Sequence, residues 1–236
     1  MYGLSADAHI IATGIRNELE HLESVDVVLC PPAIWLTEVA QIIHSQIGHL
    51  HVGIQNIFDQ DEGAYTGEIS PKMAANVAQY AIIGHSERVE HFREGPEFIN
   101  SKVHAALSAG LTPIICVGER EKNEKSKDKL VEKLHKLLTG LTPCQLAKII
   151  VAYEPVWAVG ATQPDTPENA NEVATCFQQS IHKSLKVLYG GSINENNCSE
   201  FLSQENLSGL LVGRASIKIK SFVTICRKAE AVAKEE

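Results

Sequence analysis

The chain has 236 residues, of which 44% are hydrophobic and 21% are charged, a composition that excludes wholesale disorder and a fibrous repeat. A formal net charge of −8 makes nucleic acid and anionic membranes poor candidates for the main partner. No apolar run approaches the roughly 18–20 residues of a membrane span, and we expect no secretory signal. The six cysteines are scattered, which predicts reduced thiols in the cytoplasm rather than a disulfide framework.

Short runs rich in valine and isoleucine alternate with helical patterns along the whole chain. Each run has the length and apolar character of a buried parallel strand. In chain order the predicted strands are Val25–Cys30, His51–Asn56, Ala81–Ser86, Thr112–Gly118, Lys148–Glu154, Lys186–Gly191 and Gly209–Gly213. The absence of any linker or break in composition predicts βα units and one parallel sheet, within a single domain over residues 1–236.

Several predicted helices have N-termini that can be located from the sequence. The first predicted helix, from Ser5 to about His21, has no strand before it. A cap residue followed by proline marks two further starts, at Ser70 and at Thr166, and the second of these helices is predicted to run to about Leu185. Leucines at helical spacing predict a helix within Glu119–Leu138. Seven regular units without two lobes favour a closed barrel that is one strand short of eight.

Two titratable residues are predicted at the carboxyl ends of barrel strands, where functional groups gather in this architecture. His85 and Glu154 each follow an apolar run. A partly shielded carboxylate is a competent base toward a carbon acid, and a neutral imidazole can donate a hydrogen bond to a carbonyl oxygen as negative charge develops. We expect the helix that follows His85 to disfavour its imidazolium. The residues alone leave a capping histidine and a salt-bridged glutamate as the alternative.

Glycine turns follow the last two predicted strands, at Gly190-Gly191-Ser192 and at Gly213-Arg214. Backbone N–H groups in such turns bind phosphate in many barrels, beside the N-terminus of the next helix. The helix after the first turn is predicted from about Asn194. Tight turns without a ligand remain the alternative, because glycine serves these as well.

Six segments resemble the triosephosphate isomerase family, in the family's order and spacing. The most specific are Ile83–Arg88 (IGHSER) and Ala152–Gly160 (AYEPVWAVG). The others are Gly63–Glu68, Cys116–Glu119, Tyr189–Ser192 and Leu211–Ser216. The resemblance covers essentially the whole chain. It implies a (β/α)8 TIM barrel and an isomerase of glycolysis and gluconeogenesis.

The resemblance also implies roles for individual residues. Glu154 would move a proton between two carbons of the triose, so that D-glyceraldehyde 3-phosphate and dihydroxyacetone phosphate interconvert through an enediolate. His85 would polarise the carbonyl group, and Glu87 matches a family carboxylate near the site. Cys116 matches a family position beside the site, where we expect a packing role. No metal ion and no organic cofactor are implied.

Substrate binding is implied at four further positions. Gly160, Ser192, Gly213 and Arg214 would bind the phosphate, the glycines and Arg214 chiefly through backbone N–H groups. The segment from Pro155 to Gly160 would open a lid loop over the substrate.

Two positions near the lid and the phosphate turn depart from the family. Pro164 is expected to stiffen the C-terminal end of the lid. Arg214 stands where the family has a second glycine, and its N–H can still bind phosphate if the turn does not need a positive φ there.

Gly63–Glu68 resembles a projecting loop that inserts into a partner subunit in the family. Thr66 matches the residue at the tip of that loop. The resemblance therefore implies a cytoplasmic homodimer.

The largest departure from the family is at the start of the chain. The family's first strand ends in Asn-x-Lys, whereas Met1-Tyr2-Gly3-Leu4 matches the family residues directly after that lysine. We therefore expect the first strand, its asparagine and its lysine to be absent, either because an internal methionine is taken as the start or because the sequence lacks its first segment. Two strand edges would then be unpaired. The alternative function is a catalytically impaired, non-enzymatic phosphate-binding barrel fragment.

Overall fold

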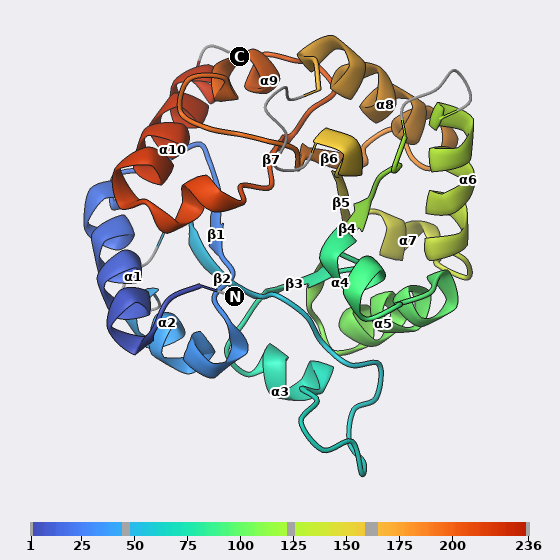
Figure 1. The fold of residues 1–236 in the computed structure, drawn as a ribbon, viewed down its shortest axis with the longest axis horizontal. Coiled ribbons are helices and arrows are strands. Elements are labelled where there is room, and N and C mark those ends of the chain that lie inside the picture. The colour runs from blue at the N-terminus through green and yellow to red at the C-terminus, as the bar shows by residue number, and fades with distance from the viewer. Residues whose placement is uncertain (1, 44–47, 122–125, 159–164, 235–236) are drawn as a thin grey trace.

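The computed structural model describes residues 2–43, 48–121, 126–158 and 165–234. Seven parallel strands form one sheet in the order β1-β2-β3-β4-β5-β6-β7, and the sheet curls inside a ring of helices (Figure 1). The strands are β1 Val27–Leu29, β2 Leu50–Ile54, β3 Tyr80–Ile83, β4 Thr112–Val117, β5 Ile150–Tyr153, β6 Lys186–Tyr189 and β7 Gly209–Leu210. Each of them lies within or overlaps one predicted run, so the seven-stranded parallel arrangement is confirmed. Within the described ranges β1 and β7 do not pair and form the two edges of the series.

Helices connect the strands and cover the outside of the sheet. They are α1 Ser5–Leu19, α2 Leu36–Ile43, α3 Pro71–Ala75, α4 Ser86–His91, α5 Pro96–Ser108, α6 Ser126–Leu137, α7 Pro143–Leu146, α8 Pro167–Ser180, α9 Cys198–Leu202 and α10 Ile219–Ala233, with 3-10 turns η1 Ala33–Trp35, η2 Val156–Ala158 and η3 Arg214–Ile217. Both predicted caps are present, because Ser70 accepts from the N–H of Met73 and Thr166 accepts from that of Asn169. No helix in the described part of the chain is long and apolar enough to cross a membrane.

Two helix boundaries differ from the predictions. The extension of α8 to about Leu185 is wrong, because the backbone leaves the helix after Ser180 and the His182 ring accepts from the N–H of Ser184. The start near Asn194 is also wrong, because α9 begins at Cys198. Residues 194–197 instead form a turn held by asparagine side chains, in which Asn197 accepts from the N–H of Asn194.

Alternation along the strands explains why the sequence runs are apolar throughout. Ile82, Ile114, Cys116 and Ala152 pack together inside the curled sheet. Their neighbours along the same strands, such as Ile83, belong to the larger cluster under the helices. A strand that is buried on both faces needs apolar residues at every position.

The first and last helices pack together beside the edge strand β1. Ile15 and Leu19 of α1, Val27 of β1, and Phe222 and Val223 of α10 form one buried cluster. Figure 1 shows α1 and α10 as neighbours at the margin of the ring. This packing covers apolar surface beside the edge strand.

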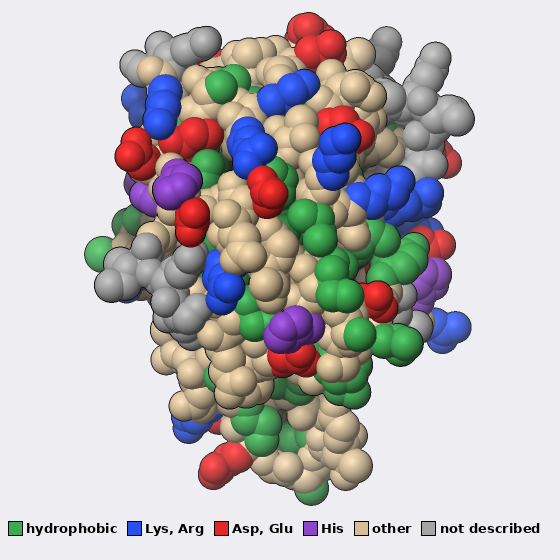
Figure 2. Space-filling model, turned by 90° about the vertical axis from the view of Figure 1, so that its left-hand side faces the viewer, with side chains coloured by type: hydrophobic (Ala, Val, Ile, Leu, Met, Phe, Trp, Pro, Cys, Tyr) green, Lys and Arg blue, Asp and Glu red, His purple; other side chains and the backbone are tan. Residues whose placement is uncertain are grey.

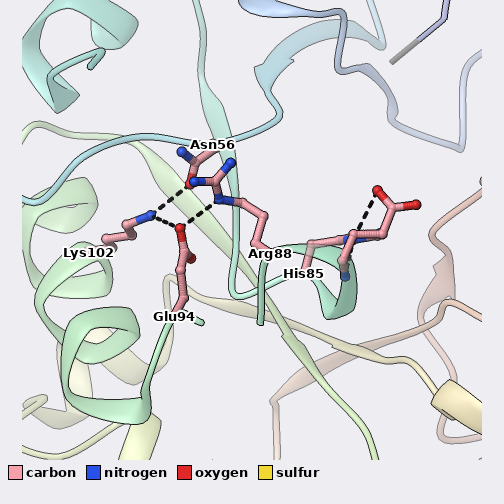
Figure 3. A network of polar contacts seen from close by, with 6 residues as sticks. Asn56, His85, Arg88, Glu94 and Lys102 are labelled. Atoms are coloured by element: carbon pink, nitrogen blue, oxygen red, sulfur yellow. Dashed lines mark hydrogen bonds and ion pairs between the residues drawn. The ribbon is translucent and has the colours of Figure 1, made fainter. Parts of the chain in front are cut away.

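A buried group of charges links α4, α5 and the segment after β2. The Oε1 atom of Glu94 accepts from Lys102 Nζ and from Arg88 Nε, each at 2.7 Å, and Lys102 also donates to Asn56 at 2.9 Å (Figure 3). Lys102 is 1% exposed and Glu94 5% exposed. Burial lowers the pKa of Lys102, although the hydrogen bond with Glu94 and its charge oppose that shift. The position of α4 therefore depends on a pair of charges that water does not reach.

Removal of the Glu94 carboxylate tests how much this buried pair contributes to the stability of the fold. In Glu94→Gln we expect a loss of about 3–5 kcal/mol in the free energy of unfolding, because Lys102 keeps a buried charge without its anion. Urea unfolding measures this quantity. Glu18→Gln is the matched control, because Glu18 accepts from Arg227 at the same 2.7 Å but both side chains are exposed. There we expect a change of less than about 1 kcal/mol, and equal losses in the two variants would contradict the assignment.

Candidate active site

Glu154 follows β5 directly, and its side chain lies inside the mouth of the curled sheet. The residue is 3% exposed, and its N–H donates to the carbonyl of Val117 at 2.8 Å. Two glycines leave room for it. A Cβ atom at Gly118 would lie 1.6 Å from the carbonyl oxygen of Glu154, and one at Gly190 would lie 2.9 Å from its Cγ. The close fit of three strand ends fixes where this carboxylate stands.

His85 reaches the same carboxylate from the end of β3. Gly84 precedes it with a φ of +73°, a conformation that favours glycine, and His85 then caps α4. Its Nδ1 accepts from the N–H of Glu87 at 3.3 Å, so the hydrogen-bond pattern assigns the ring proton to Nε2. Nε2 lies 3.1 Å from Oε1 of Glu154, and the N–H of Ser86 donates to Oε2 at 3.2 Å. Both carboxylate oxygens therefore have a donor from the β3–α4 connection.

Opposing effects set the pKa of His85. Burial lowers the pKa of His85, but the hydrogen bond with Glu154 and the charges of Glu154 and Glu87 outweigh burial, and the net pKa lies above its ordinary value of 6.5. The expected effect of the α4 N-terminus is therefore smaller than that of the neighbouring carboxylates. Glu87 acts from a distance, because its side chain is 73% exposed and its Oε2 lies 3.9 Å from Nδ1 of His85.

Cys116 packs against the site from β4. Burial raises the pKa of the Cys116 thiol well above its ordinary value, and the charge of Glu154 and a hydrogen bond with it raise the pKa further. The thiol is therefore protonated at neutral pH. It also packs among the apolar side chains inside the sheet, as does the partly buried Cys30.

The predicted phosphate-binding residues lie after β6 and β7. Ser192 is partly buried, and its hydroxyl donates to the carbonyl of Ala158 at 2.9 Å. Gly213 and Arg214 are exposed where η3 begins. Gly160 and Pro164 lie outside the described residues. In the described part of the chain no group of three or more His, Cys, Asp or Glu side chains is arranged to hold a metal ion.

The structure also contains a polar network beside Glu154 that the sequence did not reveal. The hydroxyl of Tyr153 and the indole N–H of Trp157 both donate to Oε1 of Glu119, at 2.9 and 2.8 Å. The same hydroxyl lies 3.4 Å from the carboxylate of Asp165. In the sequence these are an aromatic residue within a strand and isolated acids, and no spacing distinguishes them from ordinary core and surface residues.

The charge of Glu154 should be visible in the titration of His85. In Glu154→Gln we expect the pKa of His85 to fall. Burial lowers this pKa, and only the weaker effect of the Glu87 charge would remain to raise it. NMR titration of the ring protons, assigned with His85→Gln, measures the shift. A raised pKa also means that protonation of His85 adds stability to the fold below about pH 6.5, and that this added stability disappears as the pH rises through the pKa of His85.

Glu90→Gln provides the control for that titration. Glu90 is an exposed carboxylate on the same helix as Glu87. Its removal should leave the pKa of His85 in place. A pKa that stays unchanged in Glu154→Gln would contradict the pairing.

Comparisons with known proteins agree with this geometry. The chain matches the family model of triosephosphate isomerase over residues 1–229. Triosephosphate isomerase of Dehalococcoides mccartyi strain CBDB1 is 42% identical over 238 residues, covering 96% of this chain and 92% of the relative. That of strain 195 is 40% identical over 240 residues, covering 97% and 94%. A crystal structure of triosephosphate isomerase from Bartonella henselae has a TM-score of 0.83 and 33% identity, covering 97% of this chain and 94% of that one. This chain belongs to the triosephosphate isomerase family.

Proposed function

We propose that the protein interconverts D-glyceraldehyde 3-phosphate and dihydroxyacetone phosphate in the cytoplasm. The observation that carries the proposal is the buried carboxylate of Glu154, with its Oε1 atom 3.1 Å from Nε2 of His85, at the strand ends of a barrel of this family. Proton transfer from a carbon next to a carbonyl group needs a base, and a hydrogen-bond donor close to that base stabilises the negative charge that develops on the carbonyl oxygen. The same pairing and the family match over 1–229 disfavour a non-enzymatic barrel fragment.

The proposed reaction moves one proton between adjacent carbons. A carboxylate oxygen of Glu154 takes a proton from the carbon beside the carbonyl group, and the electron pair of the broken C–H bond forms the enediolate. Nε2–H of His85 donates to the oxygen on which negative charge develops. Glu154 then returns the proton to the neighbouring carbon. A second proton, that of the hydroxyl group on the first carbon, passes to the former carbonyl oxygen, with the His85 ring as the available carrier. No atom is gained or lost, so isomerisation is complete once both protons have moved.

Phosphate binding is proposed at the turns after β6 and β7. Ser192 contributes its hydroxyl and backbone, and Gly213 and Arg214 contribute backbone N–H groups ahead of η3. A Cβ atom at Gly191 would lie 2.1 Å from the hydroxyl of Tyr189, so this turn has no space for a side chain there. We assign Glu87 an electrostatic role beside His85 and Gly160 a further phosphate contact.

A carboxamide at position 154 should remove the proposed base. In Glu154→Gln we expect kcat to fall by at least about 10²–10⁴-fold, with a much smaller change in KM, because general-base catalysis is lost while the phosphate contacts remain. An assay coupled to oxidation or reduction of a nicotinamide cofactor follows the triose phosphates. Glu90→Gln is the control and should keep full activity. Retention of activity in Glu154→Gln would refute the assignment of the base.

We further propose that the protein is a homodimer. Residues 61–68 are all exposed, and this loop projects from the ring of helices (Figure 1). Its conformation is held in part by an aromatic contact, because the ring centroid of Tyr65 lies 4.6 Å from that of Phe58, which precedes the loop. Large exposed hydrophobic side chains occur near the N-terminus, on η1, in the loop, on α3 and at the end of α4, and they include Tyr2, Leu4, Ile34, Tyr65, Met73 and Phe92. Figure 2 shows hydrophobic side chains gathered in the lower half of the face that it presents, above the projecting loop. A second copy of the chain is the occupant that we propose, with Thr66 at the tip of the loop that enters it.

Charge in the loop should separate the subunits. We expect sedimentation velocity to give twice the 25.8 kDa mass for the unaltered chain and a monomer for Tyr65→Asp, because a desolvated carboxylate opposes association. Ile10→Asp is the matched control, since Ile10 is an exposed hydrophobic residue on α1, at 59% against 47% for Tyr65. It should remain a dimer. A monomeric unaltered chain, or a dimeric Tyr65→Asp, would contradict the proposed interface.

A further inference from the structure

Two tyrosine hydroxyls converge on one acidic residue beside the site. Tyr153 and Tyr189 are register partners on β5 and β6 and are fully buried. The Tyr153 hydroxyl, whose one hydrogen is shared with Glu119 at 2.9 Å, lies 3.4 Å from Oδ2 of Asp165, and the N–H of Asp165 donates to Tyr189 Oη at 3.3 Å. Asp165 therefore contacts the ends of both strands at once.

The carboxylate of Asp165 is itself enclosed. The residue is 3% exposed. Oδ2 accepts from the amide of Asn169 at 2.5 Å, and Oδ1 accepts from the N–H of Thr166 at 2.9 Å. Both donors belong to the first turn of α8 or its cap, where the helix dipole favours an anion. A buried carboxylate is retained only where donors compensate its desolvation, and here they fix it between α8 and the two strands.

The tyrosine hydroxyls are held in their protonated form. Burial raises the pKa of Tyr153 far above its ordinary value, and the charges of Glu119 and Asp165 raise it further. Burial and the charge of Asp165 raise the pKa of Tyr189 in the same direction. Tyr153 is thus a permanent donor placed between two carboxylates, with Glu119 nearer and Asp165 farther.

The contacts of this network lie on both sides of Glu154. Tyr153 directly precedes Glu154, and Trp157 comes three residues after it. Both side chains donate to the same oxygen of Glu119. Tyr189 precedes Gly190, where a Cβ atom would lie 2.9 Å from Cγ of Glu154. A shift of either tyrosine therefore moves backbone that touches the Glu154 side chain.

We propose that Asp165 is a positioning residue: its buried carboxylate holds Glu154 in place through Tyr153, and its backbone N–H does so through Tyr189. This inference rests on the proposed function of Glu154. The effect is assigned to the charge of Asp165. An amide of the same size keeps the shape of the side chain, but it replaces an acceptor oxygen with a donor group. That donor would face the hydroxyl or amide donors around it.

The test compares Asp165→Asn with Tyr153→Phe and with the double variant. We expect kcat to fall by about 10- to 100-fold in Asp165→Asn, with KM within about threefold, because a displaced base affects the chemical step more than binding. The double variant should lose little more than the worse single variant, since both changes act through one contact. Independent, multiplying losses would overturn the proposed route through Tyr153.

Thr166→Ala is the matched control for a merely structural effect. It removes the cap of α8 beside Asp165 without touching either tyrosine. We expect a lower melting temperature with kcat unchanged. If Asp165→Asn likewise lowers only the melting temperature, the positioning role is refuted.

An NMR measurement tests this inference independently of the proposed function. The chain has two tryptophans, so Trp35→Phe assigns the indole N–H resonance of Trp157, which reports its bond to Glu119. We expect Asp165→Asn to shift that resonance and Thr166→Ala to leave it in place. An unaltered chain without isomerase activity would refute the proposed function, whereas an unshifted resonance would refute the link from Asp165.

Discussion

The backbone of Glu154 runs so close to Gly118 that a single Cβ atom there would lie 1.6 Å from its carbonyl oxygen. This contact between neighbouring strand ends sets the position of the carboxylate, and the rest of the site is arranged around it. The β3–α4 connection supplies donors to both carboxylate oxygens, from the His85 ring and the Ser86 N–H. Gly190 lies on the third side, where an added Cβ atom would again be too close to the Glu154 side chain. The carboxylate is therefore held by steric constraint on one side and by hydrogen bonds on the other.

Two buried polar groups extend this constraint outward in opposite directions. Through His85 the site connects to α4, whose Arg88 shares Glu94 with Lys102 and so reaches the segment after β2 that leads into the projecting loop. Through Tyr153 it connects to Glu119, Asp165 and the start of α8. Each group places charge where water cannot screen it, so removal of one member leaves its partners uncompensated. Buried polar contacts of this kind define one arrangement of helices, whereas apolar packing alone tolerates several.

Much of the fold could be predicted from the sequence because the strands are buried on both faces. Uninterrupted runs such as that around Ile83 leave little ambiguity about a parallel sheet, and Pro167 after Thr166 marks a helix start by its chemistry. The ends of helices were less predictable. The end of α8 and the delayed start of α9 depend on side chains of His182 and Asn197 that compete with the helix for backbone groups. Glu154 and His85 stood out as polar residues at the ends of apolar runs. Asp165 did not, because its importance comes from two tyrosines that are far apart in sequence and adjacent only in the sheet.

The contact between His85 and Glu154 constrains how the proposed reaction can begin. In the structure the donor hydrogen of Nε2 is directed to Oε1 of Glu154, so the proposed base and the proposed electrophile satisfy each other. Substrate carbonyl oxygen and substrate carbon must each take the place of one of these partners before a proton can move. The hydrogen bond with Glu154 and the charge of Glu154 raise the pKa of His85 against the effect of burial, so the pair favours its own contact. In the proposed function the binding energy of the non-reacting phosphate is the available source for separating them, because remote contacts can offset the free energy of rearranging the reacting groups. In the proposed function, phosphate binding at the turns after β6 and β7 would therefore supply free energy for separating Glu154 from His85, in addition to holding the substrate.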